Sequence, residues 1–496
     1  MRRYKTCLLF AVFFLLFSLL ASCATPTPAP TPTSPPPTET PIHSTLTPAP
    51  TVTATAVPAP RRAQYTLNVV LDYAAKTVGV DETIVYPNRS GRALNDLVLA
   101  VEPNLWPNGF TINSLSLNGA PITDYTLDGQ KLSLTLPAVL QPEATVTLQI
   151  QYTLNLPLIE PTNPNLSRPR IYGFTPRQIN LTNWYPFIVP NVAGQWVLHD
   201  PWYYGEHLVY DAADYAVNVK SADPAVTPVI AASGAPSQNG EWTTYTLTAG
   251  RAFALSASTE FLTSSVQVGN AVMTSYYFPL YDKPGQAALQ ISAQALQIYS
   301  QRYGPYPHQT LAVVMGDFND GMEFSGFFFL SRGFYNIYDG TLKNLLTTVA
   351  AHETSHQWWF EQVASDQALQ PWLDEALAAY SERLFYENVD PNLVQWWWDY
   401  WPARIGDCRS QSWVDIAVYS GAGFCPYTDA VYVRGARFLD DLRARIGDET
   451  FFAFLQDYLA QENGRIATSE DFFRILRART QIDFSDLIRQ YFQNVY

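Results

Sequence analysis

One short motif carries the clearest chemistry in this chain. His352, Glu353 and His356 form the pattern His-Glu-x-x-His. On a helix, positions i and i+4 lie on one face and one turn apart, so both imidazoles can reach a single metal ion. The glutamate beside the first histidine is then close enough to take a proton from a water at that metal.

A catalytic metal of this kind needs a third protein ligand and one position left open. We predict that Glu375 is this ligand, because it lies on a second helical pattern that can begin at Pro371. The turn-like segment 363–370 joins this helix to the one that carries His352 and His356. Two imidazoles and one carboxylate suit a single Zn²⁺ per chain, although such a site also accepts cobalt or manganese.

A bare His-Glu-x-x-His can arise by chance, and a buried histidine is more often hydrogen-bonded than bound to a metal. This chain has only six histidines, and two of them stand at metal spacing around a glutamate. With Glu375 in a Trp-Leu-Asp-Glu-Ala context further along, the metal interpretation is the stronger one.

These segments resemble the aminopeptidase N-type zinc metallopeptidases, gluzincins that also include leukotriene-hydrolysing members. The resemblance rests on HETSHQWW at 352–359, on WLDEA at 372–376, and on the eighteen residues between His356 and Glu375. It is strongest over residues 320–436. It implies a multidomain chain in which an N-terminal all-β domain precedes an α+β, thermolysin-like zinc metallopeptidase domain.

A segment upstream of the motif resembles the family's Gly-x-Met-Glu-Asn sequence. Gly321, Met322 and Glu323 match it, whereas Asp320 replaces the glycine and Phe324 replaces the asparagine. The resemblance implies that Glu323 binds the free α-amine of a substrate, with Gly321 and Met322 as further substrate-binding residues. The alternative interpretation of Glu323 is an ordinary surface residue on a loop.

The family also supplies a second amine-binding side chain from its N-terminal domain. Residues 170–215 contain no clear counterpart of that segment.

A tyrosine hydroxyl can stabilise the oxyanion of a tetrahedral intermediate without carrying a charge. The family places such a tyrosine in a Tyr-x-Lys-Gly-Ala context at the start of a helix. Tyr432 occupies a matching segment, in which Arg434 replaces the lysine. Tyr432 is therefore the expected catalytic tyrosine, and Tyr427 ranks second. Core packing is the alternative for one of 30 tyrosines.

Other residues near the motif have simpler expectations. Trp358 and Trp359 are expected to pack behind the metal helix. Asp374 is either an acceptor that orients a metal ligand or an exposed carboxylate. No role is assigned to His199, His207 and His308, which lack metal spacing.

The first 23 residues are typical of a targeting segment. Arg2 and Arg3 begin a basic region, an apolar stretch follows from 8 to 20, and Leu-Ala-Ser leads to Cys23. This resembles a bacterial lipoprotein signal in which Cys23 is acylated, with an uncleaved membrane anchor as the alternative. We therefore expect an extracytoplasmic protein that is anchored to the membrane by lipid.

Residues 24–62 are rich in proline and threonine and predict an extended spacer. Cys408 and Cys425 remain after the leader, and they either form a disulfide or stay as two buried thiols. Alternating apolar residues predict a β domain over 64–265, and helical periodicity from about 286 places the catalytic domain at 270–496.

Composition limits the remaining function classes. The chain has 496 residues, a hydrophobic content of 47% and a formal net charge of −14, which argues against a nucleic-acid partner. The leading hypothesis is a zinc aminopeptidase acting on peptides. The alternatives are an endopeptidase or non-peptide hydrolase with the same site, and a binding protein on a retired peptidase fold. The intact Glu353 argues against the last. The sequence leaves the oligomeric state open.

Overall fold

The described residues of the computed structural model are 62–160, 171–318, 321–405 and 412–496. Cys23, Asp320 and Cys408 lie outside these ranges, as do the leader and nearly all of the spacer. Among the described residues, no helix combines the length and apolar character needed to cross a membrane.

The N-terminal part of the described chain is built from β-sheets. The alternation that predicted strands is visible in β1, where Tyr65, Leu67 and Val69 are buried and the residues between them are exposed. The largest sheet has the order β16 (Ala235–Asn239), β17 (Trp242–Gly250), β14 (Ala213–Ser221), β1 (Ala63–Asp72), β2 (Thr77–Pro87), β8 (Thr145–Asn155), β4 (Phe110–Leu117) and β5 (Ala120–Pro121). Its neighbours are antiparallel except for β1 and β14, which run parallel.

Two smaller sheets and one short hairpin complete this β region. One sheet has the order β15 (Val229–Ala232), β18 (Leu255–Ser258), β10 (Ile179–Leu181) and β9 (Gly173–Phe174). The other has the order β11 (Phe187–Ile188), β3 (Leu94–Ala100), β7 (Lys131–Leu140) and β6 (Tyr125–Asp128). The hairpin is β12 (Asn191–Val192) and β13 (Gln195–Trp196). The described residues up to 258 contain one 3₁₀ turn, η1 (Glu102–Leu105), and no α-helix, so the all-β expectation is confirmed.

The next sheet is mixed and supports the candidate site. Its order is β19 (Leu262–Val268), β20 (Ala271–Tyr277), β21 (Thr310–Gly316), β23 (Phe327–Ser331) and β22 (Met322–Phe324). The long helix α1 (Asp282–Arg302) connects the parallel strands β20 and β21. Because β19 pairs with β20, the pairing assigns residues from 262 onward to this sheet, slightly before the expected boundary at 265.

One expected strand is shorter than the sequence suggested. The aromatic and apolar residues of segment 326–335 predict a strand up to Tyr335, but β23 ends at Ser331. There the Ser331 side chain accepts a hydrogen bond from the Gly333 backbone N–H and begins α2 (Arg332–Asn336). An N-capping serine therefore ended the strand.

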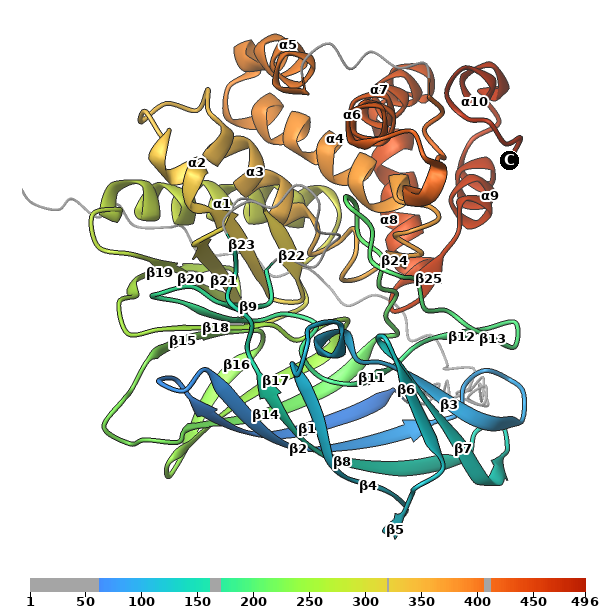
Figure 1. Cartoon of the computed structure of the whole chain (residues 1–496). Helices are drawn as coiled ribbons and strands as arrows, with labels where there is room; N and C mark the ends of the chain where they lie inside the picture. The colour runs from blue at the N-terminus through green and yellow to red at the C-terminus, as the bar shows by residue number, and fades with distance from the viewer. Residues whose placement is uncertain (1–61, 161–170, 319–320, 406–411) are drawn as a thin grey trace, which may run out of the picture. The chain divides into compact units, whose positions relative to one another are not determined.

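Helices dominate the rest of the chain, as the periodicity predicted. Figure 1 shows those from α3 onward gathered together, in yellow to red, with α1 beside β19 to β21. They are α3 (Leu345–Ser355), α4 (Trp372–Val389), α5 (Val394–Ile405), α6 (Phe424–Thr428), the π-helical η4 (Asp429–Arg434), α7 (Gly435–Ile446), α8 (Asp448–Glu462), α9 (Ser469–Arg479) and α10 (Ser485–Tyr491). The short turns are η2 (Pro391–Leu393) and η3 (Val418–Ser420), and β24 (Ala364–Ser365) pairs with β25 (Ile466–Ala467).

A buried arginine joins the β region to the helical region. Arg251 is fully buried, and its guanidinium donates to the backbone carbonyls of Tyr210, Glu361, Gln362 and Arg465 at 2.9–3.1 Å. The planar, permanently charged guanidinium suits such a fan of acceptors. This contact fixes the segment that follows α3 against the β region.

Candidate active site

The metal motif lies on α3 and its C-terminal cap. Asn344 begins this helix by accepting a hydrogen bond from the Thr347 backbone N–H. The helix α3 ends at Ser355, and His356 is its C-cap, with φ −62° and ψ −11°. Because His356 keeps helical dihedrals, the one-turn spacing to His352 is retained.

The two tryptophans after the motif pack as expected. Trp358 and Trp359 are both fully buried. Their indole N–H groups donate to the Gly304 carbonyl at 3.0 Å and to Ser381 Oγ at 3.1 Å. Both indoles therefore pack in the core next to the metal motif.

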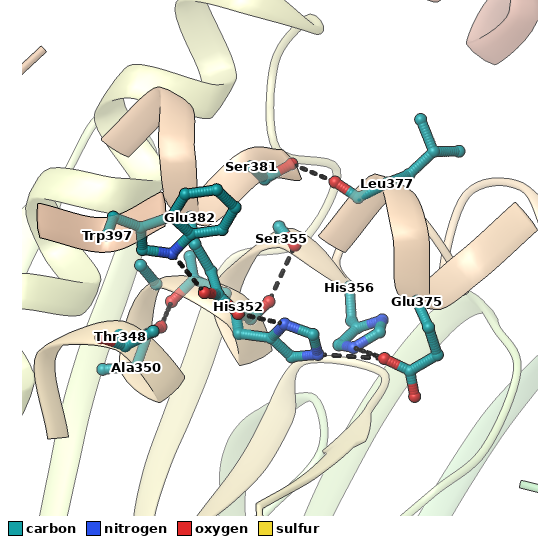
Figure 2. Close-up of polar contacts among 12 residues, drawn as sticks. Thr348, Ala350, His352, Ser355, His356, Glu375, Leu377, Ser381, Glu382 and Trp397 are labelled. Carbon is teal, nitrogen blue, oxygen red and sulfur yellow. Dashed lines mark hydrogen bonds and ion pairs between the residues drawn. The ribbon is translucent and has the colours of Figure 1, made fainter. Parts of the chain in front are cut away.

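The predicted ligands converge. Glu375 lies in the first turn of α4, and its Oε2 is 3.1 Å from His352 Nε2 and 3.7 Å from His356 Nε2. All three residues are buried, and their ligand atoms lie within 4.8 Å of one another. Figure 2 shows both imidazoles turned toward the Glu375 carboxylate.

The far nitrogen of each imidazole faces an oxygen acceptor. His352 Nδ1 is 2.8 Å from Glu382 Oε1, and His356 Nδ1 is 2.6 Å from Asp374 Oδ1 and 2.9 Å from the Trp359 carbonyl. These contacts leave Nε2 of each ring to face Glu375, which is the arrangement that a two-histidine, one-carboxylate zinc site requires. The donor set therefore fits zinc.

These contacts decide two points that the sequence left undecided or missed. Asp374 is buried and orients His356, so the first of its two interpretations is confirmed. Glu382 was missed, although it lies seven residues after Glu375 on one face of α4, a spacing that was visible in the sequence. Its second oxygen accepts a 2.7 Å hydrogen bond from Trp397 Nε1, which fixes the carboxylate.

The site concentrates buried negative charge. Its buried carboxylates are Glu323, Glu353, Asp374, Glu375 and Glu382. Burial lowers the pKa of His352, but its bonds to the carboxylates of Glu375 and Glu382 outweigh burial and raise it to about 10. Burial raises the pKa of Glu375, but the two imidazoles outweigh burial and lower it to about 2. A site of this kind favours cations.

Glu353 lies beside the ligands with one oxygen unengaged. It is buried, and its Oε2 has no hydrogen-bond partner among the described residues. Burial raises its pKa well above the usual value, against the opposing charges of His352 and His356. A methyl group added at Gly321 would lie 2.3 Å from Glu353 Oε1, so the absent side chain at 321 leaves room for this carboxylate.

Tyr432 also reaches the metal cluster. Its ring is 6.0 Å from the His352 ring, with an interplanar angle of 17°, and its hydroxyl hydrogen-bonds Glu375. Burial raises the pKa of this hydroxyl well above its usual value, so it stays a donor at neutral pH. The ring of Tyr427 packs between two other tyrosines, 6.3 Å from the ring of Tyr432 and 5.0 Å from that of Tyr204.

The predicted amine-binding residue comes from the sheet edge. Glu323 lies in β22 and is 4% exposed, so it is not an ordinary surface residue. Burial raises its pKa well above the usual value; the charge of His356 opposes this and that of Glu206 adds to it. Glu206 also raises the pKa of Tyr432. Glu206 is half-buried, and the sequence did not point to it because it lies in an irregular segment between β13 and β14.

The other described histidines pair with carboxylates away from the metal cluster. Among the described residues, His199 contacts Asp366 at 2.9 Å, His308 contacts Glu361 at 2.5 Å, and His207 contacts Glu102 at 3.4 Å. Of these pairs, His199–Asp366 joins the β region to the connection between α3 and α4, and none of the three belongs to the ligand set. Separately, Cys425 is disulfide-bonded, whereas its expected partner, Cys408, lies outside the described residues.

Together, the mixed sheet, the two packed helices and the two-histidine, one-glutamate cluster define the fold and site of a gluzincin metallopeptidase. Residues 287–491 match the model of the Peptidase family M1 domain. Over these residues the chain is similar to M1 peptidase domains, which confirms the resemblance to the aminopeptidase N-type family.

Individual relatives are distant. Aminopeptidase N of Lactobacillus delbrueckii subsp. lactis is 26% identical over 221 residues, which cover 40% of this chain and 26% of the relative. Aminopeptidase N of Lactobacillus helveticus is 23% identical over 254 residues, which cover 47% of this chain and 29% of the relative. The matched segments thus span between a quarter and a third of these curated relatives.

Solved structures share the fold over nearly the whole described chain. The M1 zinc metallopeptidase of Deinococcus radiodurans has a TM-score of 0.63 and 20% identity, covering 87% of this chain and 93% of that chain. A variant of that enzyme bound to the peptide Tyr-Ser-Ala has a TM-score of 0.62 and 19% identity, with coverage of 87% and 93%. The two-part arrangement expected from the sequence is therefore confirmed.

Proposed function

We propose that this chain is an aminopeptidase that holds one zinc ion and releases N-terminal residues from peptides. The observation that carries this proposal is the convergence of His352, His356 and Glu375, with Glu353 buried beside them. The match to the M1 domain supports the same reaction class.

The residues divide the chemistry among them. When bound by His352, His356 and Glu375, zinc would polarise the scissile carbonyl and lower the pKa of a water to about 7. Glu353 takes the proton of the attacking water and later donates it to the leaving amine, a role that its raised pKa suits. The Tyr432 hydroxyl donates a hydrogen bond to the oxyanion that forms at the scissile carbonyl.

Glu323 makes this enzyme an exopeptidase in our proposal. Its carboxylate lies close to His356 and can bind the ammonium group of a substrate. An anchored N-terminus places the first peptide bond at the metal. Glu206, whose charge acts on both Glu323 and Tyr432, adds negative potential for the same ammonium group.

Comparing free and N-acetylated substrates of the same sequence tests this proposal. We expect turnover of the free peptide to exceed that of the acetylated peptide, and Glu323→Gln to reduce the preference by raising KM for the free peptide. Equal turnover of the free and the acetylated peptide by the wild type would contradict the aminopeptidase proposal and favour an endopeptidase. Zinc without turnover of any peptide would favour a non-peptide substrate or a retired site.

We also propose that the enzyme works outside the cytoplasm, anchored by lipid on Cys23. The support is the sequence alone: a basic start, an apolar stretch and Leu-Ala-Ser-Cys. Mass spectrometry of the mature N-terminus is expected to find acylated Cys23, and Cys23→Ser is expected to leave the leader uncleaved. An unmodified Cys23 within a retained leader would instead indicate an uncleaved anchor.

A further inference from the structure

A buried glutamine lies between two buried carboxylates of the site, Glu323 and Asp374. Gln367 belongs to the connection between α3 and α4 and is 5% exposed. Its Nε2 is 2.6 Å from Asp374 Oδ2 and 3.2 Å from Glu323 Oε1. A side-chain amide has two N–H donors, whereas an ionised carboxylate only accepts, so Gln367 donates one hydrogen bond to each carboxylate.

These bonds connect the substrate end of the site to the metal end. Glu323 lies on the edge strand β22, and Asp374 lies at the start of α4. The other oxygen of Asp374 is the 2.6 Å partner of His356 Nδ1. A continuous path therefore runs from Glu323 through Gln367 and Asp374 to a metal ligand, with each step a direct hydrogen bond.

The neutral amide suits this place better than a cation would. Glu323 and Asp374 are two buried carboxylates whose charges repel each other, and some donor must hold them close together. A lysine or arginine would do so by supplying positive charge, which would then repel a substrate ammonium group. Gln367 supplies the donors and leaves the negative charge of Glu323 available.

We propose that Gln367 is a positioning residue that fixes the distance between the amine-binding carboxylate and the metal ligands. It thereby sets how far from the N-terminus the scissile bond lies. This inference rests on the proposed aminopeptidase function and adds to it a specificity determinant that lies outside the recognised motifs.

The test uses variants of the mature chain that lack the two N–H donors of the Gln367 side chain. Gln367→Met keeps the approximate side-chain length, and Gln367→Ala avoids placing an apolar group between the carboxylates. Gln362→Met is the matched control, because Gln362 lies on the same connection and, among the described residues, its side-chain amide donates to the Gln357 carbonyl at 3.3 Å and to neither carboxylate. Zinc content, kcat and KM are measured with an aminoacyl-anilide and with its N-acetylated form.

We expect zinc content to stay at the wild-type level and KM for the free substrate to rise about tenfold or more, the effect of losing a hydrogen bond to a charged group. The preference for the free over the acetylated substrate should fall by the same factor, and Gln362→Met should match the wild type. Either Gln367 variant that folds and binds zinc decides the question.

Two results would overturn the proposal while leaving the aminopeptidase intact. One is an unchanged KM and preference in the Gln367 variants. The other is a loss confined to kcat and equal for both substrates, which would mean that Gln367 acts only through His356. If the wild type itself shows no preference for the free amine, the aminopeptidase fails and this inference fails with it.

Discussion

At the scale of single residues, the metal ligands are oriented by acceptors on their outer side. Glu382 and Asp374 each hold one imidazole by its Nδ1, so that both Nε2 atoms face Glu375. Such partners fix the ring orientation and raise the basicity of the ligand. The affinity of the site for metal therefore depends on residues that never touch it.

Glu382→Gln tests this dependence. The amide keeps the shape of the side chain but loses the charge, and its N–H₂ group has no acceptor at Trp397 Nε1. We expect zinc affinity to fall about 10–100-fold, measured by competition with a chelator of known affinity. Glu462→Gln, in a buried carboxylate on α8 outside the site, should leave the affinity unchanged. Equal affinities for all three proteins would refute the role of Glu382.

Tyr432→Phe removes one hydroxyl that the account assigns to the oxyanion. We expect kcat to fall about 10²–10³-fold with KM and zinc content little changed, because the hydrogen bond matters most in the transition state. Tyr335→Phe is the control, since its buried hydroxyl has no hydrogen-bond partner among the described residues. A large rise in KM with an unchanged kcat would show instead that Tyr432 binds the substrate ground state.

The sequence predicted the site residues whose relation is local or whose motif is recognisable. His352, Glu353 and His356 follow from helix periodicity, and Glu375 from the second helix. Gln367 could not be predicted in the same way, because its two partners lie on different elements and meet only through tertiary packing. Its segment reads as a turn, and a turn pattern says nothing about which carboxylates a side chain will reach.

At the scale of elements, the site depends on close packing between α4 and the η4–α7 segment. Gly435 follows η4 directly, and an added Cβ there would lie 2.4 Å from Ala376 Cβ, next to Glu375. The glycine of the tyrosine-containing segment therefore allows the two helices to approach. This approach brings Tyr432 to the metal ligands.

Gly435→Ala should separate these helices. The overlap is with a short side chain that cannot rotate away, so we expect a destabilisation of about 1–3 kcal/mol and a fall in kcat as Tyr432 retreats. Urea unfolding and kcat at saturating substrate measure the two effects. Ala436→Ser is the control, because it changes the neighbouring position of the same helix. Gly447→Ala would be a poor control, because Gly447 has a φ of 82°, which an alanine rarely adopts. An active, fully stable Gly435→Ala would contradict the packing argument.

Element boundaries were predicted less well than the elements themselves. Ser469 is a good capping residue by type, but Thr468 is the N-cap of α9 and forms a capping box with Asp471. Both residues are good caps, and only the backbone dihedrals distinguish them. Likewise, Ser331 ended a strand that the apolar pattern alone would have continued to Tyr335.

At the scale of the whole molecule, the β region contains a buried acid that makes stability depend on pH. Glu82 is fully buried in β2, where the Tyr152 hydroxyl lies beside its carboxyl group. Burial raises its pKa well above the ordinary value of 4.5. The folded chain therefore keeps this proton at pH values where the unfolded chain loses it.

The sign of the effect follows from that difference. The contribution of Glu82 to stability is fully present below the unfolded pKa and is lost as pH rises toward the folded pKa. Glu82→Gln cannot ionise, so its free energy of unfolding should rise relative to the wild type between about pH 5 and about pH 8. Urea unfolding across this range measures the difference, and a pH-independent difference would contradict the assignment.

The central claim is that this chain is a zinc peptidase in which Glu353 is the general base. The most direct measurement is bound zinc together with aminoacyl-anilide turnover, for the wild type and Glu353→Gln. We predict about one zinc per chain in both proteins, turnover that a chelator abolishes, and a fall in kcat of about 10²–10⁴-fold in the variant. A wild type that binds no metal, or a zinc-loaded variant with undiminished turnover, would contradict this claim.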